Sequence, residues 1–249
     1  MDLRPGRNGL PCLTLMTRDG ARAEIYADGA HVTSWIPAGG SERLFLSEVS
    51  EFTPGRAIRG GVPLVFPQFS GEGALPKHGF ARNQMWELDD VAVGADQSVA
   101  RFSLEDNEAT RAIWPSRFHA TCTVVIGGDA LSVTLGIRNT DVGPFTFAAA
   151  LHTYLAVQDC RLVNVTGLTD LAYRDAALGD PPGTSPRLDT EPAVRFQAEV
   201  DRVYYGAGPV RVNEPGRTLA IAAEGLPDVV VWNPGPGLAA QLKDLPPNG

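Results

Sequence analysis

The chain has few of the residues, and none of the short motifs, on which most nucleotide-binding and metal enzymes depend. Its 249 residues include three cysteines without a CxxC pair and four histidines without a close ligand pair. A disulfide framework and a zinc site are therefore not expected, and no metal or other cofactor is predicted. The sequence contains no GxGxxG after a strand, no Walker GxxxxGKS/T, no HExxH and no GxSxG, which argues against the corresponding classes of enzyme.

Long apolar runs and an excess of positive charge are also missing. No run reaches membrane-spanning length, and no cationic segment precedes an apolar one at the N-terminus. The formal net charge of −8 argues against nucleic acid or an anionic membrane as the main partner. The net charge does not exclude a small phosphorylated ligand, because a local arginine cluster can bind phosphate inside an acidic protein. We expect a cytoplasmic monomer with reduced cysteines.

What the chain does contain is a series of short segments in which apolar and polar residues alternate. Such alternation, with β-branched and aromatic residues, is typical of half-buried strands. The segment IGGD at 126–129 predicts a tight hairpin turn, and a short helical turn is expected at 107–115. The clearest strands are predicted at 21–27, 31–37, 98–106, 118–128, 130–140, 145–157, 160–168 and 228–234.

These strands predict an all-β fold, a large antiparallel β-sandwich whose function lies on loops and on one concave sheet face. A length near 250 residues suits one large sandwich as well as two small domains. No internal repeat is present, and the proline-rich segment 178–192 is too short to link domains. We therefore expect a single domain over residues 1–249.

The stretch RGGVPLVFPQFSGEGALPKHGFAR, residues 59–82, is the first candidate for a functional loop. Arg59 precedes two glycines that would let backbone approach a ligand closely. Lys77, His78 and Arg82 follow one another within six residues. Two arginines and a lysine beside a proline-stiffened loop indicate a fork for phosphate or carboxylate. The alternative is that both arginines make ordinary ion pairs, but their combination with a histidine favours function.

Two further side chains are candidates outside this stretch. His152 lies in the apolar segment AAALHTYLAV, where a satisfied core histidine is the simpler interpretation and a proton-transferring imidazole the functional one. Asp201 lies beside two tyrosines, a combination typical of sugar pockets, although a surface pair with the neighbouring arginine is simpler. His31 and His119 are predicted to be structural.

Four segments together resemble a known family. They are AIRGGVPLVFPQFSGEG…LPKHGFARNQMWEL, ALHTYLAV, VDRVYYG and VVVWNP, in this order, between about Leu13 and Asp244. In these segments the chain resembles the D-hexose-6-phosphate mutarotases (glucose-6-phosphate 1-epimerases), a branch of the aldose 1-epimerase superfamily. The resemblance implies a galactose-mutarotase-like β-supersandwich. It also implies interconversion of the α and β anomers of hexose 6-phosphates, without a metal or nucleotide.

The resemblance further implies a role for each candidate in the long motif. Arg59 and Arg82 match arginines that contact the phosphate and the sugar. Lys77 stands where relatives can carry glutamine. His78 matches a histidine that contacts the sugar or supports a residue that does.

Among the later segments, His152 matches the catalytic acid and Asp201 an acceptor for a sugar hydroxyl. In the implied reaction one group protonates the ring oxygen while a base removes the C1 hydroxyl proton; rotation and reclosure then invert the anomer. The family's base is a glutamate in a CVE-type segment, but no glutamate follows Glu224 here. We expect this base to lie beyond Gly249. The alternatives are a non-catalytic sugar-phosphate binding protein, and an aldose 1-epimerase for unphosphorylated sugars.

Overall fold

The computed structural model describes residues 2–246. Its strands pair in antiparallel sheets, with only two short α-helices and four 3₁₀ turns, which confirms the all-β prediction. The backbone groups into two compact units, Met1–Ala156 and Val157–Gly249, which are described separately below. Two such units can also form one domain, so the single domain over residues 1–249 stays a prediction. Within the described part of the chain, no helix has both the length and the hydropathy to cross a membrane.

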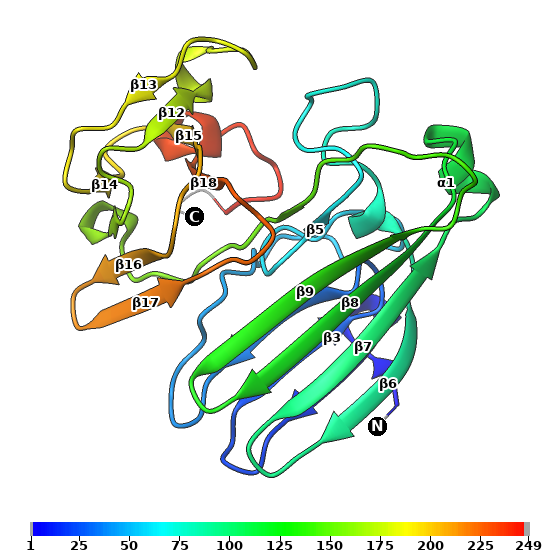
Figure 1. Ribbon diagram of the computed structural model, residues 1–249. Helices are drawn as coiled ribbons and strands as arrows, with labels where there is room; N and C mark the ends of the chain where they lie inside the picture. Colours follow the sequence, from blue (N-terminus) through cyan, green and yellow to red (C-terminus); the bar gives the residue numbers. More distant parts are fainter. Residues whose placement is uncertain (1, 247–249) are drawn as a thin grey trace. The chain divides into compact units, whose positions relative to one another are not determined.

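The first unit contains two four-stranded antiparallel sheets with the orders β1-β2-β3-β4 and β6-β7-β8-β9. The four strands of the second sheet lie side by side in this order in Figure 1. The strands of the first sheet are β1 Arg4–Pro5, β2 Pro11–Met16, β3 Arg22–Tyr26 and β4 His31–Ile36. Those of the second are β6 Glu87–Val93, β7 Ser98–Glu105, β8 Phe118–Gly127 and β9 Ala130–Asn139.

Strand β8 shows why alternation in the sequence predicts strands here. From Phe118 to Ile126 every second residue is buried, and the residues between them are partly exposed. Because successive side chains of a strand point to opposite faces, the buried set forms one side of the core. The hairpin to β9 turns at Gly128, whose φ of +55° suits glycine, as predicted.

The second unit also contains two four-stranded antiparallel sheets, with the orders β14-β11-β16-β17 and β13-β12-β15-β18. Val200 and Tyr204 of β15 belong to its buried core. The strands are β11 Asn164–Thr166, β12 Ala172–Asp175, β13 Arg187–Leu188, β14 Val194–Arg195, β15 Val200–Tyr204, β16 Val210–Glu214, β17 Arg217–Ile221 and β18 Val229–Asn233. The helical elements of both units are α1 Glu108–Ile113, α2 Gly235–Ala239, η1 Arg7–Gly9, η2 Ala81–Asn83, η3 Cys160–Leu162 and η4 Ala176–Leu178.

The predicted helical turn at 107–115 is confirmed as α1. The side chain of Asn107 accepts a hydrogen bond from the Thr110 amide, and the Thr110 hydroxyl accepts one from the Asn107 amide. This reciprocal capping stabilises a helix too short to persist alone.

The predicted strand at 145–157 is largely wrong. Only Ala150–Leu151 (β10) is a regular strand, and it pairs with Leu64–Val65 (β5). The rest of the segment is extended and continues the same register, since the amides of Ala148, His152 and Tyr154 donate to the carbonyls of Pro67, Pro63 and Gly61. Because Pro63 and Pro67 have no N–H to donate in return, this pairing is one-sided and forms no regular ladder. The predicted strand at 160–168 is also too long. Only β11 is a strand there, because η3 occupies the first residues of the segment.

The two glycines after Arg59 serve the fold itself. Gly60 has φ +119° and Gly61 φ +63°. A Cβ atom on Gly60 would lie 2.4 Å from the Phe45 carbonyl oxygen, and one on Gly61 would lie 2.2 Å from that of Val32. The close backbone approach is therefore to the backbone of Phe45 and Val32 and not, as the sequence predicts, to a ligand, and it fixes the turn that carries Arg59.

Substituting Gly61→Ala is expected to destabilise the protein by more than about 3 kcal/mol, because backbone strain and a clash with a carbonyl add. Gly39→Ala is the matched control: Gly39 has φ +64°, but a Cβ atom added there would have nothing within 4 Å. It should cost only about 1 kcal/mol of strain. Urea unfolding of the two variants measures the difference, and equal losses would contradict this account of Gly61.

Candidate active site

The segment around His152 brings two aromatic side chains to one face of the first unit. The His152 amide donates to the Pro63 carbonyl at 3.1 Å, and the Tyr154 amide donates to the Gly61 carbonyl at 2.8 Å. This is the spacing of an extended chain, in which side chains two residues apart point the same way. His152 and Tyr154 therefore share a face beside the turn of Arg59.

His152 is held between two other rings. Its imidazole stacks on Tyr154, with centroids 4.7 Å apart and planes at 17°. The ring of His78 stands nearly perpendicular to it, at 86° and 5.5 Å. The Tyr154 hydroxyl in turn accepts a hydrogen bond of 2.9 Å from Nη1 of Arg59. Three of the predicted site residues are thus brought together, with a tyrosine that was not predicted among them.

His78 is oriented by the loop that precedes it. It is a buried residue with φ +65°, and the Ser70 amide donates to its Nδ1 at 3.1 Å. Because Nδ1 accepts a hydrogen bond, the neutral ring carries its proton on Nε2. The predicted histidine of KHGF therefore presents an N–H donor beside His152.

The stiffness of this loop comes from a buried glutamine as well as from the prolines. Nε2 of Gln68 donates to the Leu75 carbonyl at 2.9 Å, and its Oε1 accepts from the Leu75 amide at 2.9 Å. This pair of bonds closes the loop in the way a neighbouring strand would. Gln68 was missed in the sequence, although a glutamine between apolar residues in VFPQF is a signal for a buried polar group with defined partners.

Arg82 lies on η2 with its charge only partly compensated. Its Nη2 donates to the Lys77 carbonyl at 3.1 Å. Its Nε is buried and has no hydrogen-bond partner within residues 2–246, and no ion pair of Arg82 with a carboxylate occurs there either. Burial lowers its pKa, and the nearby Arg59 adds to this effect. The ordinary ion pair weighed as an alternative for Arg82 is therefore absent from the described chain.

Both histidines of the cluster are neutral at pH 7 in the unliganded protein. Burial lowers the pKa of His152 to about 4, and the positive charges of Arg82, Arg59 and Lys77 contribute to this shift. Burial, followed by the charge of Arg82, lowers the pKa of His78 to about 3. The exposed Lys77 therefore lies close enough to act on both rings. The five predicted residues of the first unit form one cluster, in which Arg59, Lys77 and Arg82 supply the positive charge.

Asp201 lies in the second unit, on β15 opposite Trp232 of β18. The neighbouring Arg202 points to the other face of the strand, where it pairs with Asp175 at 3.3 Å and with Asp189 at 3.4 Å. The partners of Arg202 are thus two buried carboxylates of its own unit. The role of Asp201 in the site stays a prediction.

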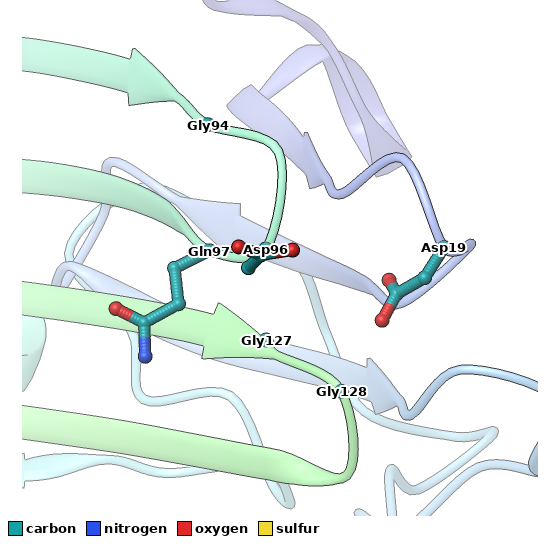
Figure 2. Close-up of a pocket in the computed structure, with 6 residues that line it drawn as sticks. All are labelled: Asp19, Gly94, Asp96, Gln97, Gly127 and Gly128. Carbon is teal, nitrogen blue, oxygen red and sulfur yellow. The ribbon is translucent and has the colours of Figure 1, made fainter.

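A separate hollow of about 640 Å³ opens at the far ends of the strands of the first unit (Figure 2). The other end of β8, at Phe118, packs on Phe66 at 5.3 Å, next to the loop that carries His78. At about 3.3 Å per residue, β8 separates the hollow from the histidines by roughly 30 Å. The hollow is lined by Asp19, Gly94, Asp96, Gln97, Gly127 and Gly128. It is therefore not the site built by the histidines and arginines.

The described residues include no group of three or more histidine, cysteine or carboxylate side chains that could hold a metal ion. His31, set aside as structural, is buried, and its Nε2 lies 2.8 Å from the Gly60 carbonyl oxygen. Since a carbonyl only accepts, Nε2 carries the proton of the neutral ring. Burial lowers the pKa of His31 to about 4. His31 thus stabilises the turn at Gly60 and Gly61 through this hydrogen bond.

Comparison with known proteins shows which family the chain resembles over almost its whole described length. The chain is 38% identical over 251 residues to a protein of Cenchrus ciliaris named "Putative glucose-6-phosphate 1-epimerase", and the match covers 96% of this chain and 74% of the relative. The crystal structure of YeaD from Salmonella typhimurium, described as a "putative mutarotase", superposes with a TM-score of 0.88 at 31% identity, over 97% of this chain and 80% of that one.

A galactose mutarotase-like protein from Clostridium acetobutylicum superposes with a TM-score of 0.76 at 14% identity, over 94% of this chain and 85% of that one. At this identity the likeness shows the fold alone, and it confirms the galactose-mutarotase-like fold that the sequence motifs implied. The family model for aldose 1-epimerase matches residues 11–246, almost the whole described chain. The protein with this cluster of two arginines, a lysine and two histidines is therefore a member of the aldose 1-epimerase family.

Proposed function

We propose that the protein is a hexose-6-phosphate 1-epimerase, which interconverts the α and β anomers of glucose 6-phosphate and related sugars. The observation that carries the proposal is the guanidinium of Arg82, which is partly buried without a carboxylate partner in residues 2–246 and lies close to Arg59 and Lys77. A buried cation without a counter-charge is costly, and a phosphate dianion would supply the missing charge. The name of the Cenchrus ciliaris relative supports the same substrate.

In this proposal the arginines and the lysine bind the phosphate, and the histidines act on the sugar. Arg59 and Arg82 hold the phosphate through paired N–H donors, and Lys77 adds a point charge at the exposed edge. His78 donates its Nε2–H to a sugar oxygen, because the Ser70 amide occupies its Nδ1. The role of Asp201 is to accept a hydrogen bond from a sugar hydroxyl.

His152 is the proposed acid that protonates the ring oxygen. In the unliganded protein its pKa is about 4, so the ring holds only one proton at neutral pH. A phosphate dianion bound to the three cations offsets their contribution and raises this pKa toward the working pH, where general acids are most effective. As the ring opens, the proton moves from His152 to the ring oxygen, and a base takes the C1 hydroxyl proton. Reclosure on the other face returns both protons.

We also propose a location, an oligomeric state and a class of ligand. The protein acts in the cytoplasm, as a monomer, on a small sugar phosphate and on neither nucleic acid nor membrane. Its acidic net charge of −8 is compatible with this, because Arg59, Lys77 and Arg82 form a local group of positive charges.

The proposal is tested by measuring α/β equilibration with freshly dissolved α-glucose 6-phosphate and α-glucose, followed by polarimetry or NMR. We expect kcat/KM to be about 10²-fold higher for the phosphorylated sugar, because the arginines contribute only to that substrate. Equal values would instead indicate an aldose 1-epimerase for unphosphorylated sugars. Binding of glucose 6-phosphate without any acceleration would indicate a binding protein, and neither binding nor acceleration would reject all three functions.

A further inference from the structure

We propose that Tyr154 is a positioning residue that joins the phosphate-binding Arg59 to the proton donor His152, so that one side chain orients both. The roles of Arg59 and His152 in this inference are those of the proposed function. Tyr154 itself need not touch the sugar. Its ring contacts the imidazole, and its hydroxyl contacts the guanidinium.

The contact between Tyr154 and His152 fixes the plane of the imidazole. The Tyr154 ring lies against the face of the His152 imidazole at 4.7 Å and 17°, and His78 meets the same imidazole at 86°. Two rings in different orientations restrict rotation about both side-chain torsions of His152. Because the nitrogens of an imidazole lie in its plane, a ring on its face leaves them able to reach a substrate. The stack therefore orients the proton donor without blocking it.

The second contact fixes the arginine. Nη1 of Arg59 donates to the Tyr154 hydroxyl at 2.9 Å, and the guanidinium carbon lies 5.9 Å from the centre of the Tyr154 ring. At its other end, the Arg59 amide donates to the Ser50 hydroxyl at 2.8 Å. Arg59 is thus held at its backbone and at its tip before any anion binds, which lowers the entropy lost on binding.

The backbone of Tyr154 does not depend on its side chain. Its amide donates to the Gly61 carbonyl at 2.8 Å, and its carbonyl accepts from the Phe45 amide at 3.0 Å. A substitution at this position should therefore leave the segment that carries His152 in place. The side chain can be shortened in two steps that separate its two contacts.

Tyr154→Phe keeps the stacked ring and removes the hydroxyl. Because one modest hydrogen bond is lost, we expect KM for glucose 6-phosphate to rise about 2- to 10-fold while kcat stays within about 2-fold. Tyr154→Leu removes the stacked ring as well. We expect kcat then to fall by a further factor of about 10 or more, because the imidazole is no longer held at the productive angle.

Tyr26→Phe is the matched control. Tyr26 lies in the same unit, its ring packs on Phe52 at 4.9 Å, and its hydroxyl accepts from the Arg7 amide at 3.0 Å. Removing that hydroxyl should lower stability without changing kcat or KM. If Tyr154 were merely structural, its variants would behave like this control, with unchanged kinetics per folded molecule, and the inference would be overturned.

A measurement that needs no turnover separates this inference from the proposed function. The ring signals of His152 are assigned by comparison with His152→Gln and titrated by NMR, with and without inorganic phosphate as the probe. In the wild type, phosphate should shift the His152 signals and raise the pKa of the ring. In Tyr154→Phe and Tyr154→Leu the response to phosphate should shrink. An unchanged response in both variants would overturn the role of Tyr154, even in a protein that proved to have no epimerase activity.

Discussion

His152→Gln is expected to lower kcat for the anomerisation of glucose 6-phosphate by about 10²- to 10⁴-fold, the usual contribution of a general acid. Glutamine approximates the size of the imidazole and keeps an N–H donor, but it cannot deliver a proton. KM should change little, because the arginines that hold the phosphate are untouched. Stopped-flow polarimetry or exchange NMR at saturating substrate gives kcat directly.

The control for this variant is His119→Gln. His119 lies on β8, paired with Glu105 of β7 and Arg138 of β9, on the face of the sheet opposite the buried residues. It should retain wild-type kcat. If His152→Gln kept more than about a third of the wild-type kcat, far above the loss of a general acid, the proton would have to come from another group, and His78 would be the next candidate.

Arg82→Met is expected to weaken binding of glucose 6-phosphate by about 30-fold or more, while leaving the protein as stable as before or more stable. The two effects share one cause. The guanidinium is partly buried without a carboxylate in the described residues, so it costs free energy in the empty protein and recovers it only when an anion binds. Methionine fills the space of the side-chain stem without the charge.

Calorimetry measures the dissociation constant for glucose 6-phosphate, and thermal unfolding without ligand gives the change in stability. Arg56→Met serves as the control, since Arg56 forms an exposed pair with Glu51 at 3.6 Å and should affect neither quantity. A large loss of stability in Arg82→Met would contradict the proposal, because it would mean that the guanidinium stabilises the folded protein in the absence of an anion.

The fold could be predicted wherever one sheet face is buried and the other is not. Strands β7, β8 and β9 lie within a residue of their predicted bounds. In β7 and β8 every second side chain is buried, and in the first half of β9 half-buried side chains alternate with exposed ones, so all three leave a clear alternation in the sequence. The segment 145–157 misled for the opposite reason. Its residues are apolar and extended, but its partner segment contains Pro63 and Pro67, which cannot donate, so the pairing is one-sided. The composition of the segment itself does not report the prolines of its partner.

The charged residues and the histidines of the candidate site could be predicted from the sequence. The residues that hold them in place were harder to predict. Arg59, Lys77, His78, Arg82 and His152 have side chains whose chemistry is visible in the sequence, and the structure brings them together in one unit. Tyr154 and Gln68 act through contacts that their immediate sequence neighbours do not reveal. The position of Tyr154 in the site can be predicted from its spacing, because it follows His152 by two residues. Side chains two residues apart lie on the same face of an extended segment.

The amide bridge from Gln68 to Leu75 also decides which positions of the loop can change without moving His78. Residues 71–74, inside the bridge, are all exposed. His78, outside it, is buried and fixed by the Ser70 amide. Ser70 lies inside the bridge together with the tip, so a change that disturbs the bridge also reaches His78. A Cβ atom at position 71 would meet nothing within 4 Å, whereas one at position 73 would lie 2.2 Å from Oε1 of Gln68. The tip can therefore accept a side chain at position 71 without moving the histidine, but position 73 requires glycine.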